Sequence, residues 1–222
     1  MGKVIDMSHV IIPGKSDRKF ILETIGADEV NPNVVRLPNQ WYIMNNIQMV
    51  SHIGTHIEAP FHIRKDGLDL ARLPLEKFWG EAVILDLRNL PPRQEISSDQ
   101  VADAARRAGR IHRGDIVLGN LGFSRFYGTP EYQQNPFFST KAIQWLIQEG
   151  MKMMGVDASG VEIPGSESHV NHHALFEREI PLIENLTGFD QITKTRVQLY
   201  AFPIAVEGLE SFPVRVVAFE PD

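Results

Sequence analysis

The sequence predicts an α/β fold whose N-terminal half is rich in β-structure. From about residue 81 onward, apolar strand patterns alternate with amphipathic helix patterns, which is typical of mixed sheets with some parallel strands. The first eighty residues instead carry short strand patterns among loops, including KVIDMSHVI and WYIMNNIQMV. Because 222 residues suit one sizeable core, we expect a single domain over residues 1–222.

The first helix of the alternating half has clear start and stop signals. Ser97 precedes an amphipathic run, Gln100 completes a capping box with it, and Gly109 supplies the stop. Strand patterns lie on both sides of this helix and continue to the C-terminus. They read EAVILDL, DIVLGN, KMMGVD, IPLIEN, RVQLYAFPIAV and FPVRVVAFE.

Two further helices are expected between these strands. The run STKAIQWLIQEG predicts a helix capped by Ser139 or Thr140 and ended by Gly150. A shorter helix is expected near residues 172–177, just before the strand IPLIEN. The order of strands and helices therefore favours crossover connections in the second half of the chain.

Composition excludes several classes of protein. A formal net charge of −6 argues against a nucleic-acid partner, and the run of Arg106, Arg107, Arg110 and Arg113 reads as a solvated helix face. The chain has no cysteine, which removes disulfides and thiolate metal sites and fits a reducing cytoplasm. No apolar run approaches transmembrane length, so we expect no membrane partner and a cytoplasmic location.

The stretch SHIGTHIEAPFH, residues 51–62, concentrates chemistry-bearing side chains. It contains three of the eight histidines, His52, His56 and His62, together with Glu58. In an extended strand, residues four apart lie about 13 Å apart, too far to share one ion. Gly54 allows a bend, so we expect a strand that breaks into a compact turn and gathers two imidazoles and a carboxylate.

Such a ligand set without thiolate suits Zn, Mn, Fe or Co in the divalent state. Three protein ligands also leave room for water, which is typical of catalytic sites. The alternative is that the histidines are scattered surface or core residues with ordinary polar partners. Two histidines at this spacing beside a carboxylate favour the metal site over that alternative.

Two acidic residues end apolar strand patterns farther along the chain. Asp157 ends MMGVD and Glu184 ends PLIE, at the carboxyl ends of strands, where α/β folds bind ligands. Asp157 is explained equally well as a turn former or helix cap. Glu184 is harder to explain in that way, because glutamate is a poor turn residue and its neighbours are apolar.

The motif HIGTHIEAPFH resembles the signature H-x-G-T-H-x-D-x-P-x-H of the cyclase family of metal-dependent hydrolases, which includes bacterial kynurenine formamidase and isatin hydrolase. Three weaker segments occur in the family's order: IDMSH, GVDASGVE and HHALFEREIPLIENL. The resemblance extends from about Asp6 to about Leu186. It implies a swivelling β/β/α-type fold with a mixed sheet, in agreement with the strand and helix patterns.

The resemblance implies a role for each matching residue. His52 and His56 fall on metal-binding histidines, and Glu58 falls on the carboxylate that bridges two metals in binuclear members. His172 and Glu184 match the second histidine and glutamate ligands, although His173 is adjacent to the first of these. His62 falls on the general acid/base. One or two divalent ions, Zn or Mn, are therefore expected, and family members commonly form homodimers or homotetramers.

The chain departs from the family pattern at two carboxylates and in one segment. Glu58 and Glu162 stand where the family usually has aspartate, which leaves metal number and preference open. The family's tryptophan-bearing segment near the N-terminus is reduced here to Pro13 and Gly14. Because that tryptophan belongs to the kynurenine-specific pocket, its absence argues against kynurenine formamidase activity as such.

The expected activity is hydrolysis of an amide, as a formamide or cyclic amide, or of a lactone in a small molecule by metal-activated water. Glu58 or Glu184 would orient the water or accept its proton, and His62 would protonate the leaving group. Trp41, Phe61 and Phe123 are candidate substrate-binding walls, for which core packing is the alternative.

Two other functions remain open from sequence. A lyase or cyclase could use the same ion to stabilise an enolate of a carbonyl substrate. A non-enzymatic metal-binding or ligand-sensing protein would need no acid/base group such as His62 beside its ligands. A serine hydrolase is poorly supported, because Ser124 lacks the second glycine of a nucleophile elbow.

Overall fold

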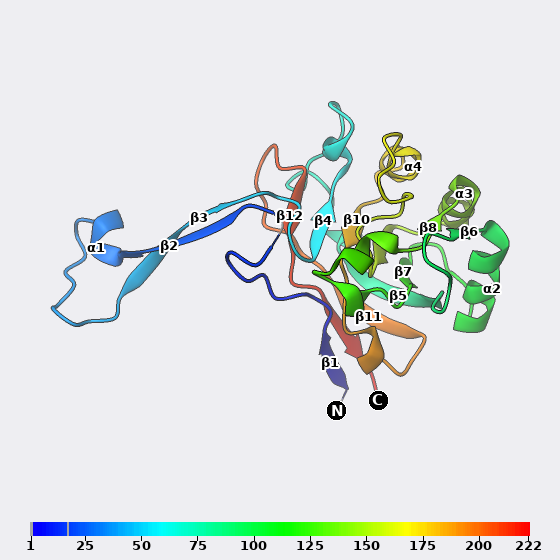
Figure 1. The fold of residues 1–222 in the computed structure, drawn as a ribbon, viewed down its shortest axis with the longest axis horizontal. Helices are drawn as coiled ribbons and strands as arrows, with labels where there is room; N and C mark the ends of the chain where they lie inside the picture. The colour runs from blue at the N-terminus through cyan, green and yellow to red at the C-terminus, as the bar shows by residue number, and fades with distance from the viewer. Residues whose placement is uncertain (1, 17) are drawn as a thin grey trace.

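The computed structural model describes residues 2–16 and 18–222, and its centre is a nine-stranded mixed sheet (Figure 1). In sheet order the strands are β1 (Lys3–Asp6), β13 (Val217–Glu220), β11 (Arg196–Tyr200), β5 (Trp79–Asp86), β7 (Ile116–Asn120), β9 (Met153–Val156), β10 (Leu182–Glu184), β4 (His56–Glu58) and β12 (Ser211–Pro213). The four central strands, β5, β7, β9 and β10, are parallel, and the strands on either side pair antiparallel. The predicted α/β class with a mixed sheet is confirmed.

Three helices cover one face of this sheet. They are α2 (Ser98–Ala108), α3 (Thr140–Glu149) and α4 (Val170–Phe176), and they pack on sheet residues such as Val83, Val117 and Met154. Alternate residues of the same strands, including Ala82 and Leu118, face a second core on the opposite side. This alternation buries both faces of the central strands, which explains why their sequences are continuous apolar runs.

The helix boundaries follow the local signals. The Ser97 hydroxyl accepts from the Gln100 backbone N–H, the Gln100 side chain accepts from the Ser97 N–H, and Gly109 ends α2 in the left-handed conformation. Helix α3 has Ser139 as its N-cap and Gly150 as its left-handed C-cap, which settles the choice between Ser139 and Thr140. These boundaries could be predicted because capping is a contact between near neighbours in the chain.

Other predicted strands are shorter than their apolar patterns. The pattern RVQLYAFPIAV forms a strand only over Arg196–Tyr200, and the pattern KVIDMSHVI only over Lys3–Asp6. The structure also has strands that no pattern indicated, β4 among them, and a small parallel pair of β6 (Glu95–Ile96) and β8 (Phe137–Phe138). Short 3-10 turns complete the chain: η1 (Pro60–His62), η2 (Leu75–Lys77), η3 (Ser124–Phe126), η4 (Pro130–Gln134) and η5 (Phe189–Gln191).

A two-stranded arm projects from the body (Figure 1). It consists of β2 (Phe20–Gly26), the short helix α1 (Ala27–Val30) and β3 (Ile43–Met49). The middle of each of its strands is exposed, and exposed apolar side chains occur along the arm: Ile21, Leu22, Trp41, Met44 and Ile47. An isolated hairpin of this kind is at best marginally stable in water, so the arm needs a surface to pack against.

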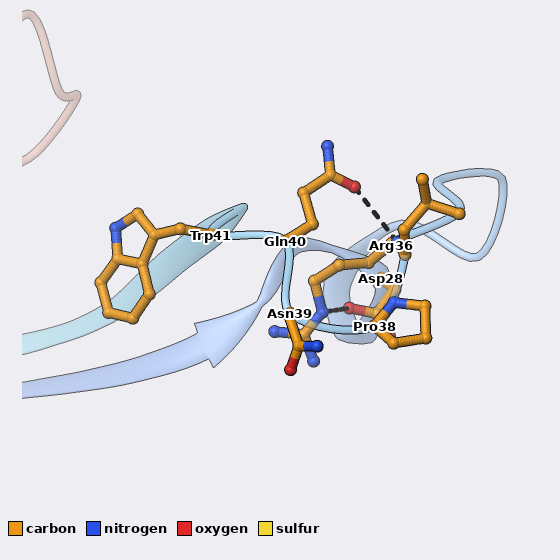
Figure 2. A pocket seen from close by; sticks show the side chains of 7 residues that line it. Asp28, Arg36, Pro38, Asn39, Gln40 and Trp41 are labelled. Atoms are coloured by element: carbon orange, nitrogen blue, oxygen red, sulfur yellow. Dashed lines mark hydrogen bonds and ion pairs between the residues drawn. The ribbon is translucent and has the colours of Figure 1, made fainter.

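The outer end of the arm is held by polar contacts (Figure 2). Arg36 Nε lies 2.9 Å from Asp28 Oδ1, and the Leu37 backbone N–H donates to Gln40 Oε1 at 3.1 Å. Trp41, on the same loop, points away from these residues and is 83% exposed. The loop is therefore ordered internally, while its largest apolar side chain is left uncovered by the described residues.

Among the residues that the structure describes, no helix combines the length and apolar character of a membrane span.

Candidate metal centre

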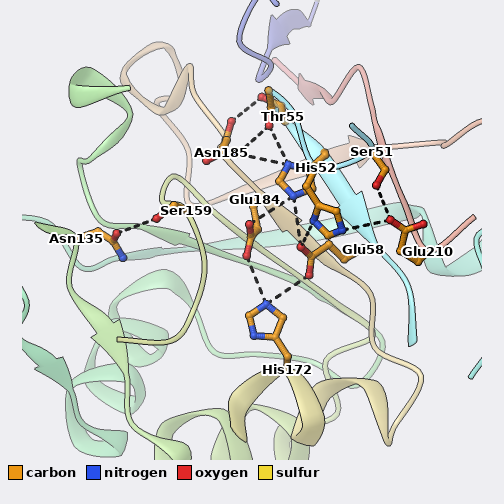
Figure 3. A network of polar contacts seen from close by, with 12 residues as sticks. Ser51, His52, Thr55, Glu58, Asn135, Ser159, His172, Glu184, Asn185 and Glu210 are labelled. Atoms are coloured by element: carbon orange, nitrogen blue, oxygen red, sulfur yellow. Dashed lines mark hydrogen bonds and ion pairs between the residues drawn. The ribbon is translucent and has the colours of Figure 1, made fainter. Parts of the chain in front are cut away.

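Three segments that are distant in sequence bring five histidine and glutamate side chains together (Figure 3). His52 comes from a turn, His56 and Glu58 from β4, His172 from α4, and Glu184 from the end of β10. They form two groups whose potential ligand atoms lie within 4.8 Å of one another: His52, His56 and Glu58, and then Glu58, His172 and Glu184. Glu58 belongs to both groups.

Sheet register explains how β4 and β10 meet here. The two strands are antiparallel, with Glu184 directly opposite His56 and Leu182 opposite Glu58. Side chains at alternate positions of a strand share a face, so His56 and Glu58 project to the same side as Glu184. The Glu184 carboxylate therefore lies close to that of Glu58, in the same group of potential ligand atoms.

His52 reaches the same place through a turn before β4. Gly54 has φ of +64°, and a Cβ there would lie 2.6 Å from Ile11 Cγ1. Only glycine adopts this conformation at such close approach without strain. The turn brings the His52 ring to 5.0 Å from the His56 ring. The predicted turn after the strand is observed, but His56 and Glu58 lie on a strand of their own, β4, and not in the turn.

The carboxylates lie between the imidazoles. Glu58 Oε1 is 2.9 Å from His52 Nδ1 and 3.4 Å from His56 Nε2, while its Oε2 is 3.4 Å from His172 Nε2. Glu184 is 3.5 Å from both His172 Nε2 and His56 Nε2, through different oxygens. Each carboxylate therefore presents one oxygen to each side of the cluster.

Burial makes this arrangement costly without a cation. The side chains of Glu58 and His56 are 3% exposed and that of Glu184 is 9% exposed. Two buried atoms of the cluster, His56 Nε2 and Glu58 Oε2, have no hydrogen-bond partner among the described residues. Buried polar atoms are normally paired, so the two unpaired atoms of this cluster fit a site for a cation.

The pKa shifts show the same imbalance of charge. Burial alone would raise the pKa of Glu58, but contacts with His172, His52 and His56 outweigh burial and hold the pKa well below its usual value. Burial alone would lower the pKa of His172, yet Glu162, Glu184 and Glu58 raise the pKa to about 12. The carboxylates thus demand positive charge, which protons or a divalent ion can supply.

Gly160 leaves space beside the cluster. Its φ is +144°, and a Cβ there would lie 3.0 Å from Glu184 Oε1 and 4.0 Å from His172 Cε1. A Cβ at this position would crowd the Glu184 carboxylate and make ordinary van der Waals contact with His172. The backbone therefore forms a cradle that an ion with its ligands can use.

Two of the histidines are held from behind by other groups. The Nδ1 atom of His172 lies 3.1 Å from Glu162 Oε1, which also accepts from the backbone N–H groups of Asn171 and His172. His56 Nδ1 lies 2.9 Å from the Gly54 carbonyl oxygen. A histidine that donates from Nδ1 to an acceptor presents an unprotonated Nε2 inward, as metal ligation requires.

The Gly54 carbonyl is itself fixed by a side-chain network. Asn185 Nδ2 donates to it at 2.8 Å, and Tyr132 donates from its hydroxyl to Asn185 Oδ1 at 2.7 Å. Asn185 directly follows Glu184 and has φ of +60°. A strained residue held by buried hydrogen bonds beside a cluster is typical of a functional site.

The remaining candidate residues have different environments. His62 is half-buried in η1, with its ring 4.4 Å from that of His52 and 6.4 Å from that of His172, and burial lowers its pKa. Phe61 precedes His62 and is partly buried, and Phe123 is buried against Phe126. Trp41 lies on the arm, apart from the cluster in this single chain.

Side-chain exposure separates the two adjacent histidines of α4. His172 is buried and reaches Glu58 and Glu184, whereas His173 is exposed.

Asp157 does not enter either group; its carboxylate accepts from the backbone N–H groups of Leu121, Phe123 and Ser124. Through these long-range contacts Asp157 holds the loop after β7, instead of forming a turn or helix cap of its own.

Sequence reasoning assigned no role to three polar residues around the cluster. In the sequence, Glu162 stands out only as a departure from the family pattern, and Asn185 only as part of a motif. Glu210, 3.5 Å from His52 Nε2, has no spacing signal, since it lies in a loop far along the chain. Their positions depend on tertiary contacts that no local pattern encodes.

The sequence matches the family described as "Putative cyclase" over residues 5–163, which is more than half of the chain. The chain belongs to this cyclase family. The family match thus includes His52, His56, Glu58, His62 and Glu162, and the predicted resemblance is confirmed.

Curated and solved relatives agree with this cyclase-family membership. The kynurenine formamidase of Erythrobacter litoralis is 28% identical over 213 residues, covering 92% of this chain and 88% of that protein. The isatin hydrolase A structure from Labrenzia aggregata has a TM-score of 0.83 at 23% identity and covers 100% of this chain and 94% of that one. A "predicted metal-dependent hydrolase" from Bacillus stearothermophilus has a TM-score of 0.77 at 26% identity, with both chains fully covered.

Proposed function

We propose that this cyclase-family protein is a metal-dependent hydrolase that cleaves a carbon–nitrogen amide bond of a small molecule. The observation that carries this proposal is the pair of His/Glu groups that share Glu58. The names of its relatives support the reaction class, since kynurenine formamidase and isatin hydrolase both act on non-peptide amides. Among substrates of this class, we favour formamides and cyclic amides, with lactones as related esters.

The residues of the cluster divide into two ligand sets. His52, His56 and Glu58 would hold one divalent ion, and Glu58, His172 and Glu184 a second. Nitrogen and carboxylate ligands without thiolate favour Zn or Mn. When bound, such an ion supplies Lewis-acid polarisation of a carbonyl group and acidifies a water molecule.

His62 is proposed as the proton-transfer residue. Its ring lies beside His52, yet among the described residues it belongs to neither ligand group, so we assign its nitrogens to the substrate. Because burial lowers its pKa, the neutral form that can accept a proton predominates at neutral pH. After accepting that proton, His62 can deliver it to the leaving nitrogen.

Glu184 and the aromatic residues would position the reactants. Glu184 has two oxygens on different sides of the cluster, so it can orient water while remaining a ligand. Phe61, next to His62, and Phe123 are proposed as walls for an apolar part of the substrate. The incomplete tryptophan segment near Pro13 and Gly14 supports an amide substrate other than a kynurenine derivative.

An activity screen tests the reaction class directly. The metal-loaded protein is incubated with formamides, cyclic amides and lactones, and the products are analysed by mass spectrometry. Addition of one water to an amide substrate is the expected result. A product formed without uptake of water, after elimination or cyclisation, would contradict hydrolysis and favour the lyase or cyclase alternative.

We also propose that the protein is a homo-oligomer, with a homodimer as the simplest form. The exposed apolar side chains of the arm support this, because they find no packing partner within the described chain. A second copy offers the same surfaces, so two arms can be buried by one symmetric contact.

A cytoplasmic location and a single domain over residues 1–222 remain predictions. Cell fractionation tests the first, and the number of thermal unfolding transitions tests the second.

A further inference from the structure

The second nitrogen of His52 faces a carboxylate that belongs to neither ligand group. His52 directs Nδ1 to Glu58 Oε1 at 2.9 Å, and its Nε2 lies 3.5 Å from Glu210 Oε1 (Figure 3). The Nε2 atom is buried and makes no hydrogen bond among the described residues. A small closing movement would let it donate to Glu210.

Glu210 is held in place by contacts on two sides. Its backbone carbonyl accepts from the Ala59 N–H at 2.8 Å, and it directly precedes β12, in which Ser211 pairs opposite Glu58. The Ser51 hydroxyl donates to Glu210 Oε1. Ser51 is the residue before His52, so one contact ties the carboxylate to the turn that carries the ligand.

The position of Glu210 is that of an outer partner. Its oxygens do not join either set of ligand atoms that lie within 4.8 Å of one another, so Glu210 is placed behind His52. His172 has the same arrangement with Glu162, which contacts the ring nitrogen opposite the cluster. A carboxylate behind a ligating imidazole fixes its tautomer and raises its basicity.

We propose that Glu210 is the positioning residue of the first ion site. It accepts a hydrogen bond from Nε2 of His52, so that Nδ1 is unprotonated and directed at the ion, and Ser51 holds Glu210 in the required orientation. This inference rests on the proposed metal-dependent function. The inference extends the proposed function, because it assigns a role to Glu210, a residue outside the motif and the ligand groups.

The test measures the affinity for Zn²⁺ by competition with a chromophoric chelator, so it needs no substrate. We expect Glu210→Ala to weaken the first site by roughly 10–100-fold, the usual effect of removing such a partner. Glu210→Gln keeps an acceptor oxygen but no charge, so its Zn²⁺ affinity should fall less than that of Glu210→Ala. Glu207→Gln, an exposed residue in the same loop, is the matched control and should bind like wild type.

A double-mutant cycle with His52→Ala separates positioning from a general electrostatic effect. If Glu210 acts through His52, Glu210→Ala has no further effect on Zn²⁺ affinity once His52 is alanine. A similar loss in both backgrounds would overturn the positioning role, as would equal affinity of Glu210→Ala and wild type. Circular dichroism of each variant establishes that it is folded.

Co²⁺ absorption provides a second readout, because the spectrum reports the ligand field of the bound ion. The Glu210→Ala spectrum should differ from wild type, and that of Glu207→Gln should not. A wild-type protein that binds neither Zn²⁺ nor Co²⁺ would overturn the proposed function itself. Normal wild-type binding with an unchanged Glu210→Ala protein would overturn only the role of Glu210.

Discussion

Glu58 is the residue on which both ligand groups depend. Its two oxygens point to different histidines, and its side chain is almost completely buried. A buried carboxylate is stable only with nearby positive charge, so the surrounding histidines and an ion compete to supply it. Most relatives of this motif are expected to carry the shorter aspartate here, and the longer glutamate still reaches both groups in this chain.

At the residue scale, the first prediction concerns His62. His62→Ala should retain its metal content and fold but lose roughly 10²–10⁴-fold in turnover, because a general acid/base contributes about that much. The metal content and the rate are measured on the same preparations. His62→Gln retains hydrogen bonding without proton transfer and should be almost as slow as the alanine variant.

Two outcomes would contradict this role. Loss of metal from His62→Ala would make His62 a ligand. An unchanged rate with unchanged metal would remove it from the mechanism.

The side chains of the site were predictable from sequence only where a motif carried them. His52, His56 and Glu58 follow from spacing and ligand chemistry, while His172 and Glu184 needed the family resemblance. Exposure then distinguished His172 from its neighbour. Glu210 could not be found, because its contact with His52 is made across more than 150 residues and leaves no local pattern.

At the element scale, the loop after β9 controls the space around the ligands. Gly160→Ala should weaken Zn²⁺ binding and destabilise the fold by about 1–3 kcal/mol, since φ of +144° is strained for alanine and the new Cβ would press on Glu184. Chelator competition and chemical denaturation measure the two effects.

A matched control lies in the same loop. Gly165 also has positive φ, +83°, but a Cβ there meets no atom within 4 Å. Gly165→Ala should therefore lose some stability and keep normal Zn²⁺ affinity. Equal Zn²⁺ affinity of wild type, Gly160→Ala and Gly165→Ala would show that the cradle at Gly160 does not shape the site.

Helices with capping residues close to them in sequence were predicted well, whereas short strands that depend on pairing with distant strands were not. Ser97 and Gly109 bound their helix as expected, because caps are contacts within a few residues. Strand β4 has only three residues, and its pairing with β10 and β12 makes it a strand. Its sequence, HIE, carries no strand pattern, so the turn was predictable but the strand was not.

At the scale of the whole molecule, the arm is the feature that a single chain leaves unexplained. Leu22 and Ile47 are direct cross-strand partners, and both are exposed. We expect the wild-type protein to have the mass of at least two chains in light scattering. The pair Leu22→Lys with Ile47→Glu keeps an attractive cross-strand contact, so the hairpin is retained while the apolar contact between copies is lost.

That double variant should have a smaller mass than wild type. Val4→Lys, an exposed apolar site on β1, is the control and should not change the mass. A wild-type protein that is monomeric at micromolar concentration would contradict the proposed oligomer. The arm would then need a different partner.

The sequence predicted the α/β class and the mixed sheet, because alternating patterns are a property of the whole chain. It did not predict the projecting arm. The run WYIMNNIQMV alternates too weakly to show which face would be buried, and in this chain most of β3 is exposed on both faces. Isolated apolar strand patterns therefore indicate a strand without indicating what covers it.

Elemental analysis of the purified protein tests the central claim most directly. Wild type should contain at least one equivalent of a divalent transition metal, Zn or Mn, per chain. His56→Ala should contain much less, because His56 lies opposite Glu184 and contacts Glu58 as well. Equal metal content in wild type and His56→Ala, or none in wild type purified without chelators, would contradict the account.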